Sequence, residues 1–133
     1  MIVADTNLIV YLLVQGTFTS GARAVYQKDP DWAAPLLWRS EFRNVLVRSL
    51  RRGLLSLDDA LSVMEEAEEL MGAREHQSPS SLMLRLAADS GCSAYDCEFV
   101  ALAQELGVPL VTADQVLIEK FRPAVVSTQT FTL

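Results

Sequence analysis

Residues 93–114 read SAYDCEFVALAQELGVPLVTAD and predict a helix, a tight turn and a buried strand in immediate succession. Gly107 suits the left-handed conformation that ends many helices, and Pro109 prevents the helix from continuing. Leu110 and Val111 then form a short apolar strand. Before the turn, apolar residues recur with the helical period, at positions 99, 100, 102, 103 and 106. This pattern indicates a helix that packs one face against a core.

Two acids stand at the ends of these packed elements. Asp96 lies three residues before Phe99 and four before Val100, so it continues the apolar stripe toward the start of the helix. A carboxylate in line with a buried face is unusual, because burying a lone charge is costly. Asp114 follows the strand directly. Glu98 lies about 200° around the helix from Asp96, and we expect it to face solvent.

The composition bounds the class of protein. A chain of 133 residues, half of them hydrophobic, is long enough for one domain with a substantial core. No apolar run approaches the ~20 residues that span a bilayer. The start, MIVAD, has no basic region and is not a signal peptide. We therefore expect a cytoplasmic protein, in which Cys92 and Cys97, with a spacing that fits no redox or zinc motif, are reduced structural thiols.

The net charge of −6 argues, taken alone, against a protein that binds nucleic acid. The distribution of charge weakens that argument. Five of the eleven basic residues fall within positions 39–52, where Glu41 is the only acid. The local field matters more for binding than the bulk charge does. Seven acids lie between Asp58 and Glu75, and we expect the run at 65–69 to be a solvated helix face.

Apolar segments and turn residues predict strands that alternate with helices. The strands are expected at 2–4, 32–34, 110–111 and 124–127, with residues 73–77 weakly extended. The helices are expected at 8–14, 20–28, 37–52, 57–71, 78–90, 94–106 and 115–121, with Ser56 and Asp59 as a capping box and Ser78 as a cap. Such alternation indicates an α/β fold with a parallel sheet. Sites in such sheets form outside the carboxyl ends of the strands, where Asp5 and Asp114 stand.

Four acids are candidates for one site. Asp5, Asp96 and Asp114 could each simply cap the start of a helix. Glu41 could lie in the first turn of its own helix, where the helix dipole stabilises a negative charge. Two points favour a shared site: all four are placed to project toward one sheet edge, and each is tied to a packed apolar element. Four converging carboxylates would repel one another without a cation. Mg²⁺ or Mn²⁺, which prefer oxygen ligands, would relieve that repulsion.

The order and spacing of these motifs resemble a known family. MIVADTN at the start, SEFRNVL in the third helix, SAYDCEFVALA and LVTAD together look like a PIN-domain ribonuclease, most closely the VapC type, the toxin of bacterial and archaeal toxin–antitoxin pairs. The resemblance covers the whole chain, 1–133, as a single PIN domain. It implies a PIN-like three-layer α/β/α sandwich with a mainly parallel central sheet of four to five strands.

The resemblance also implies site residues. Asp5, Glu41, Asp96 and Asp114 match the catalytic acids that hold one or two Mg²⁺ or Mn²⁺ ions. Thr6, Asn7 and Thr112 match small polar positions beside them, where we expect hydrogen bonds that orient the acids. Some relatives carry a further acid next to the last aspartate, whereas this chain has Gln115. The number of metal ions therefore stays open between one and two.

The activity implied is hydrolysis of RNA phosphodiester bonds, leaving a 5′-phosphate and a 3′-hydroxyl. Arg39 and Arg43, one turn apart, are candidates for guiding phosphates; alternatively they form a solvated face or meet an acidic partner. His76 is expected to be a surface or edge residue and not a general base. The implied partners are RNA, a small antitoxin whose C-terminal segment covers the acidic pocket, and a second copy in a homodimer. Aliphatic faces around Leu8, Leu12 and Leu61 could serve that dimer.

Other functions fit the residues less well. An aspartyl phosphatase typically has a second Asp where this chain has Asn7, and a receiver domain wants a lysine at a strand end, whereas Lys120 lies in a predicted helix. A PIN nuclease in RNA processing, outside any toxin system, remains an alternative. So does a catalytically silent PIN-like module that binds RNA or protein, although the presence of all four acids argues against it.

Overall fold

The computed structural model describes all 133 residues, and strands alternate with helices along most of the chain. The strands are β1 (Ile2–Ala4), β2 (Trp32–Pro35), β3 (Glu75–His76), β4 (Leu110–Val111) and β5 (Val125–Val126). The helices are α1 (Thr6–Leu13), α2 (Thr19–Lys28), α3 (Leu37–Arg51), α4 (Leu57–Met71), α5 (Ser80–Ser90), α6 (Ala94–Leu106), α7 (Gln115–Lys120) and α8 (Thr128–Phe131).

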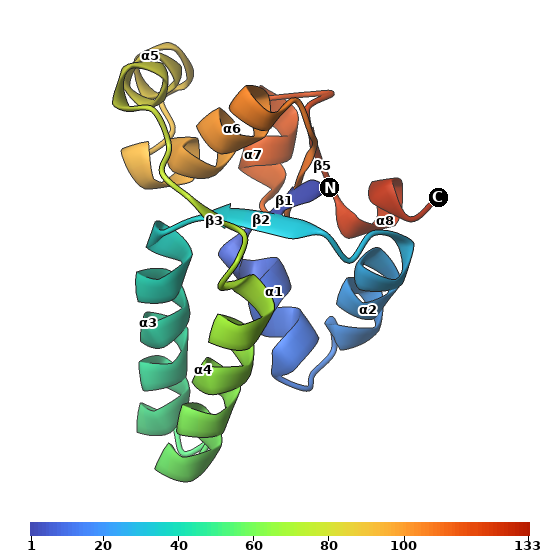
Figure 1. The fold of residues 1–133 in the computed structure, drawn as a ribbon, viewed down its shortest axis with the longest axis vertical. Coiled ribbons are helices and arrows are strands. Elements are labelled where there is room, and N and C mark those ends of the chain that lie inside the picture. Colours follow the sequence, from blue (N-terminus) through green and yellow to red (C-terminus); the bar gives the residue numbers. More distant parts are fainter.

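The five strands form one parallel sheet in the order β3-β2-β1-β4-β5, with β1 at its centre (Figure 1). Val3 pairs with Ala33 on one side and with Leu110 on the other. All strands except β3, which is Glu75–His76, read as unbroken apolar runs, because the sheet is covered on both faces. The carboxyl ends of all five strands share one edge, so the residues that follow β1 and β4 meet there.

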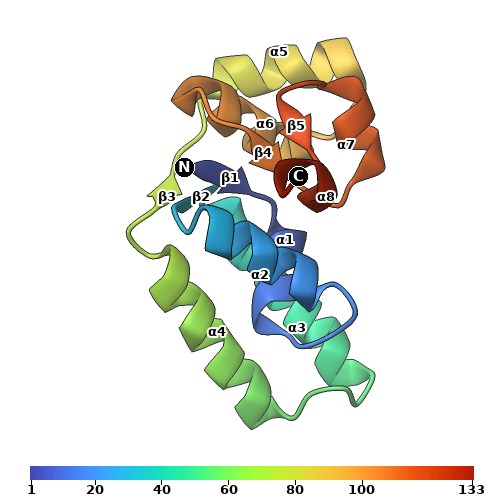
Figure 2. The same cartoon turned by 90° about the vertical axis from the view of Figure 1, so that its right-hand side faces the viewer.

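Helices cover both faces of the sheet, as Figures 1 and 2 show. Helices α1 to α4 lie on one side, and α3 and α4 extend away from the sheet as an adjacent pair. Helices α5, α6 and α7 lie on the other side, where α6 packs across β1, β2 and β4. The three-layer α/β/α sandwich with a parallel sheet, expected from the sequence, is confirmed.

The core fills the space between the sheet and the two helix layers. Its largest fully buried side chains are Trp32, Trp38, Phe42 and Phe99. Trp38 and Phe42 make an edge contact along α3, with ring centroids 5.7 Å apart. Burial of these rings supplies the hydrophobic driving force that holds α3 and α6 against opposite faces of the sheet.

The local signals at 93–114 have the predicted effect. Gly107 ends α6 in the left-handed conformation, with φ of 68°. Ser93 begins the helix as a cap that accepts a hydrogen bond from the backbone N–H of Asp96 at 3.1 Å. The capping box between Ser56 and Asp59 at the start of α4 is also present. The chain thus starts and stops these helices where its capping residues stand.

Several expectations need correction. Ser78 does not cap α5: Pro79 occupies that position, and the Ser78 hydroxyl donates to the backbone carbonyl of Glu98 at 2.8 Å. The terminal helix α8 was not expected from the sequence. Leu8, offered for a dimer face, lies fully inside the core and cannot serve an interface, whereas Leu61 is 59% exposed. No helix combines the length and apolar character needed to cross a membrane.

Candidate metal centre at the carboxyl edge of the sheet

Asp5 stands at the centre of the carboxyl edge, where β1 ends and α1 begins. Its carboxylate caps α1 by accepting a hydrogen bond from the backbone N–H of Thr6 at 2.8 Å. The Thr112 hydroxyl donates to the other oxygen, Oδ2, at 2.6 Å. Burial raises the pKa of Asp5 from its ordinary value of 3.8 to about 6, and the charges of Glu41 and Asp96 add to this effect, although both hydrogen bonds oppose it.

Asn7 and Thr112 connect Asp5 to the segment that carries Asp114. The Asn7 amide donates to Asp5 Oδ2 at 3.4 Å and to Thr112 Oγ1 at 3.3 Å. The Thr112 hydroxyl oxygen also accepts from the backbone N–H of Asp114 at 3.0 Å. Thr112 is fully buried, whereas Asp5 and Asn7 are partly buried. The hydrogen bonds expected beside the acids are therefore present, and they couple the ends of β1 and β4.

Glu41 reaches the same edge from α3, where it lies beyond the first turn. The expectation that Glu41 occupies that turn is wrong, so attraction to the helix dipole does not explain its position. The Thr6 hydroxyl donates to Glu41 Oε1 at 2.7 Å. Burial raises the pKa of Glu41, and the nearby charge of Asp96 raises it further. Thr6 thus orients Glu41 while the same residue's backbone N–H holds Asp5.

Asp96 and Asp114 complete the group from the start of α6 and of α7. Burial raises the pKa of Asp96, the charge of Asp114 raises it further, and a hydrogen bond with Ser93 opposes both effects. Asp114 caps α7: its Oδ1 accepts from the backbone N–H groups of Val116 at 2.9 Å and Leu117 at 3.2 Å. The four predicted acids therefore lie close enough for their charges to act on one another, in a chain from Asp5 to Asp114.

No base neutralises these acids. The ion pairs of the structure all lie elsewhere, namely Met1 with Asp29, Arg39 with Glu68, Arg39 with Glu75, and Arg74 with Asp31. A set of carboxylates without basic partners is the donor set that a hard divalent cation fits. However, no group of three or more His, Cys, Asp or Glu side chains is arranged to hold a metal ion with the side chains as they stand. The donor chemistry fits a cation, and the oxygens must draw together to coordinate one.

Glu98 is closer to this group than the helical spacing suggests. It is half-buried, and its pKa is raised by burial and then by the charge of Glu41. Glu98 was expected to face solvent but is only partly exposed, and the segment before α5 lies beside it, since the Ser78 hydroxyl donates to its backbone carbonyl. Glu98 thus adds to the negative field on the Glu41 side of the edge.

The two arginines expected to guide phosphates have different environments. Arg39 donates hydrogen bonds to Glu75 from Nε at 2.6 Å and from Nη2 at 2.8 Å, and to Glu68 from Nη1 at 2.6 Å. The Trp38 indole also donates to Glu75. Arg39 is therefore neutralised as a structural link between α3, α4 and β3, which argues against a role with RNA. Arg43 is exposed and joins no ion pair.

His76 and the two cysteines, also considered in the sequence, lie outside the group of acids. His76 lies on β3 at one edge of the sheet, as expected. Cys92 and Cys97 are free thiols, and burial raises the pKa of Cys97. Neither cysteine belongs to a group that could hold a metal ion.

Comparison with known proteins agrees with this geometry. The family model described as "PIN domain" matches residues 2–121. Ribonuclease VapC3 of Pyrobaculum aerophilum is 33% identical over 129 residues, which cover 95% of this chain and 98% of the relative.

Solved structures share the fold at lower identity. The crystal structure of PAE2754 from Pyrobaculum aerophilum has a TM-score of 0.77 at 20% identity, covering 98% of this chain and 85% of that one. FitAcB from Neisseria gonorrhoeae has a TM-score of 0.72 at 18% identity, covering 97% and 99%. A toxin–antitoxin complex from Klebsiella pneumoniae has a TM-score of 0.68 at 18% identity, covering 96% and 98%.

Burial of Asp5 predicts a stability effect in metal-free protein. Because its pKa in the folded state exceeds the ordinary value, ionising Asp5 destabilises the fold as pH rises from about 4 to about 6. Asp5→Asn should therefore raise the free energy of unfolding by up to about 3 kcal/mol at pH 7.5 and by much less at pH 4. Urea denaturation in EDTA at both pH values measures this.

The matched control is Glu65→Gln, which removes one charge from an exposed position on α4 and should change neither value. A gain in stability for Asp5→Asn that is equal at both pH values would contradict the assignment of the effect to ionisation.

Proposed function

The chain belongs to the PIN-domain family, and on this premise we propose that it is a metal-dependent endoribonuclease, the toxin of a toxin–antitoxin pair acting on cytoplasmic RNA. The observation that carries the proposal is the group of Asp5, Glu41, Asp96 and Asp114 at one sheet edge, where no basic side chain pairs with them and where burial and neighbouring acids raise the pKa values of the first three. The related Ribonuclease VapC3, similar along almost the whole of both chains, supports the same reaction.

These four acids would hold one or two Mg²⁺ or Mn²⁺ ions, of which the second is less favoured because Gln115 offers no charge beside Asp114. Such an ion offsets phosphate charge and acidifies water, which is the chemistry that phosphodiester hydrolysis needs. The protein's own part is positional. Thr112 and Asn7 hold the Asp5 carboxylate, and Thr6 holds that of Glu41.

The cap contacts leave room for further ligands. Asp114 uses only Oδ1 to cap α7, so its Oδ2 stays available at the edge of the site. Asp5 is held on both oxygens by hydrogen-bond donors, which fixes its direction before any substrate arrives. Such preorganisation avoids reorientation cost at the moment of reaction.

The first test is cleavage of labelled structured RNAs by the purified protein with Mg²⁺, with Mn²⁺ and with EDTA. Asp5→Asn and Asp96→Asn should each slow cleavage by about 100-fold or more, as expected when a group acting at the reacting centre is removed. Thr112→Val, which keeps the shape but removes the hydroxyl, should slow it by about 10-fold. Glu65→Gln is the control and should cut normally. Aspartate variants as fast as the wild type, or cleavage undiminished by EDTA, would refute the proposal.

We further propose that Arg43, and not Arg39, guides the RNA backbone. Arg43→Glu should weaken cleavage and make it less dependent on salt, because removing one phosphate contact lowers the slope of log rate against log salt by about 1. Arg51→Glu makes the same charge change at the far end of α3 and should affect both the cleavage rate and its salt dependence less than Arg43→Glu does. A salt slope identical to that of the wild type would remove Arg43 from the path of the RNA.

An apolar surface supports the proposal of a protein antitoxin. Leu54, Leu57 and Leu61 are 70%, 62% and 59% exposed on the turn before α4 and along its first half. Leu54 lines a groove of about 540 Å³, together with Leu13, Val14, Leu55 and Val63 among others. Exposed clusters of this kind mark protein interfaces. The neighbour from Klebsiella pneumoniae, solved as a toxin–antitoxin complex, has the same fold.

Replacing Leu54 and Leu57 together by Asp should abolish co-purification with the small protein encoded directly upstream, while cleavage by the isolated enzyme stays unchanged. Leu84→Asp, at a 66% exposed leucine on α5, is the matched control and should leave the complex intact. Undiminished binding by the double variant, measured by calorimetry, would place the interface elsewhere. Absence of any such neighbouring gene would favour a nuclease in RNA processing.

A further inference from the structure

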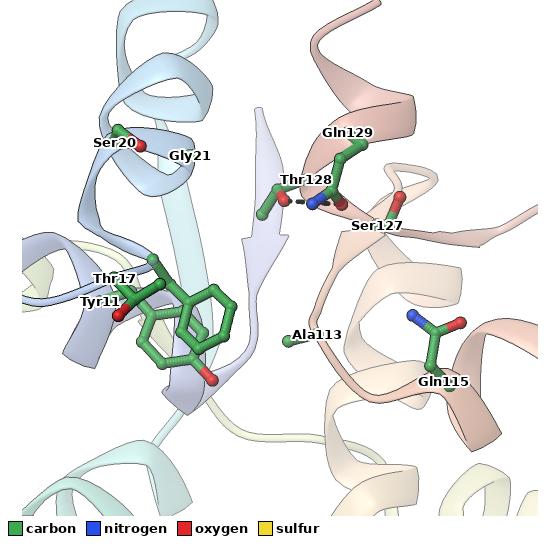
Figure 3. Close-up of a pocket in the computed structure, with 10 residues that line it drawn as sticks. Tyr11, Thr17, Ser20, Gly21, Ala113, Gln115, Ser127, Thr128 and Gln129 are labelled. Carbon is green, nitrogen blue, oxygen red and sulfur yellow. Dashed lines mark hydrogen bonds between the residues drawn. The ribbon is translucent and has the colours of Figure 1, made fainter.

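A groove of about 410 Å³ opens beside the acidic edge, outside the group of acids themselves. Figure 3 shows its two walls. Tyr11 and Phe18 come from α1 and the loop that leads to α2, while Ala113, Gln115 and Gln129 come from the segments that follow β4 and β5. The groove thus lies at the carboxyl ends of the strands, as ligand sites in parallel sheets do.

The lining of the groove carries no charge, although the chain has a net charge of −6. The side chains of Gln115, Ser127 and Gln129 offer both hydrogen-bond donors and acceptors. Ala113 is the only aliphatic side chain in the lining. A neutral ligand with several donors and acceptors matches this surface better than a phosphate or an apolar helix does.

Two aromatic rings form part of one wall. The centroids of Tyr11 and Phe18 are 4.9 Å apart with an angle of 38° between the planes. Phe18 is 60% exposed, so its ring offers a free surface supported from behind by Tyr11. Single-stranded nucleic acids are held on such rings by stacking of individual bases, whatever their sequence.

The groove is joined directly to the acids through the chain around Asp114. Ala113 and Gln115, which line it, are the two neighbours of Asp114 in sequence. The Ala113 backbone N–H donates to the Asn7 side chain at 3.4 Å, and Asn7 also contacts Asp5. A nucleotide whose phosphate lay at Asp114 would therefore place its neighbour's base within reach of the groove.

We propose that this groove receives an unpaired nucleobase of the RNA strand, adjacent to the phosphate at the acidic edge, and stacks it on Phe18. The proposal rests on the proposed ribonuclease function and names the part of the substrate that this second site recognises. An antitoxin segment is the less suited occupant, because the exposed leucines Leu54, Leu57 and Leu61 lie on a different surface.

Binding of free nucleosides tests the proposal without any need for cleavage. Adenosine, cytidine and uridine, which carry no charge, are titrated into ¹⁵N-labelled protein in EDTA, with ribose as the control that lacks a base. The backbone amide signals of Phe18 and Gln129 should shift with the nucleosides and not with ribose. Phe18→Ala should raise the Kd by about fivefold or more, as loss of one stacking contact does.

Two further variants separate recognition from general damage. Gln129→Ala, at an exposed position, should weaken the nucleosides unequally, because their hydrogen-bonding edges differ. Leu84→Ala, the control for Phe18→Ala, removes an apolar side chain of similar exposure on α5 and should leave every Kd unchanged. Absence of shifts at the groove with all three nucleosides, equal shifts with ribose, or an unchanged Kd in Phe18→Ala would overturn the proposal.

Cleavage by the wild type then distinguishes this proposal from the proposed function. RNAs with a single abasic nucleotide at successive positions should show slower cleavage when the missing base lies next to the cut, and Phe18→Ala should add no further loss on that RNA. Nucleoside binding at the groove without any RNA cleavage would refute the ribonuclease and not the base site. Metal-dependent cleavage that is unaffected by the abasic nucleotide and by Phe18→Ala would refute the base site alone.

Discussion

The hydrogen bond from the Thr112 hydroxyl to the Asp5 carboxylate, 2.6 Å long, joins the ends of the two central strands. Asp5 is partly buried, and a carboxylate removed from water is costly unless donors satisfy it. Here the donors are Thr112, Asn7 and the backbone of Thr6, and each comes from an element that the sheet holds in place. The position of the acids therefore depends on the pairing of β1 with β4. A shift of one residue in that pairing would turn the wrong side chains toward the carboxylate.

The order of the strands explains why four acids from distant segments meet. β1 occupies the centre of the sheet, so α6 can pack across β1, β2 and β4 and bring Asp96 toward Asp5 from one face. α3 follows β2 and brings Glu41 from the other face, where Thr6 receives it. Burial raises the pKa values of Asp5, Glu41 and Asp96, and the charge of a neighbouring acid raises each further, so these acids repel one another. Hydrophobic burial of Trp38, Phe42 and Phe99 on the same two helices offsets that repulsion.

The sequence predicts the strands, most helices and the identity of the acids, because these follow from local periodicity, capping residues and recognisable motifs. It does not predict the surroundings of Arg39 or Glu98. Arg39 lies 29 and 36 positions before its partners Glu68 and Glu75, and only the folded arrangement of α3, α4 and β3 brings them together. Helical spacing placed Glu98 away from Asp96 without information on what covers α6. The groove beside Asp114 is likewise formed by four separate segments, none of which carries a signal alone.

The central position of β1 also determines how much of the chain must be present before the group of acids can assemble. On one side β1 pairs with β4, a strand far away in the sequence, through Val3 with Leu110 and Ala4 with Val111. Pairing of strands so distant in sequence slows folding, because a long loop must close before the contacts stabilise it. A fragment that ends before β4 lacks both Thr112 and Asp114, so it holds Asp5 without its main hydrogen-bond donor and without its partner acid. Such a fragment therefore cannot assemble the group of four acids, whatever else of the sheet it forms.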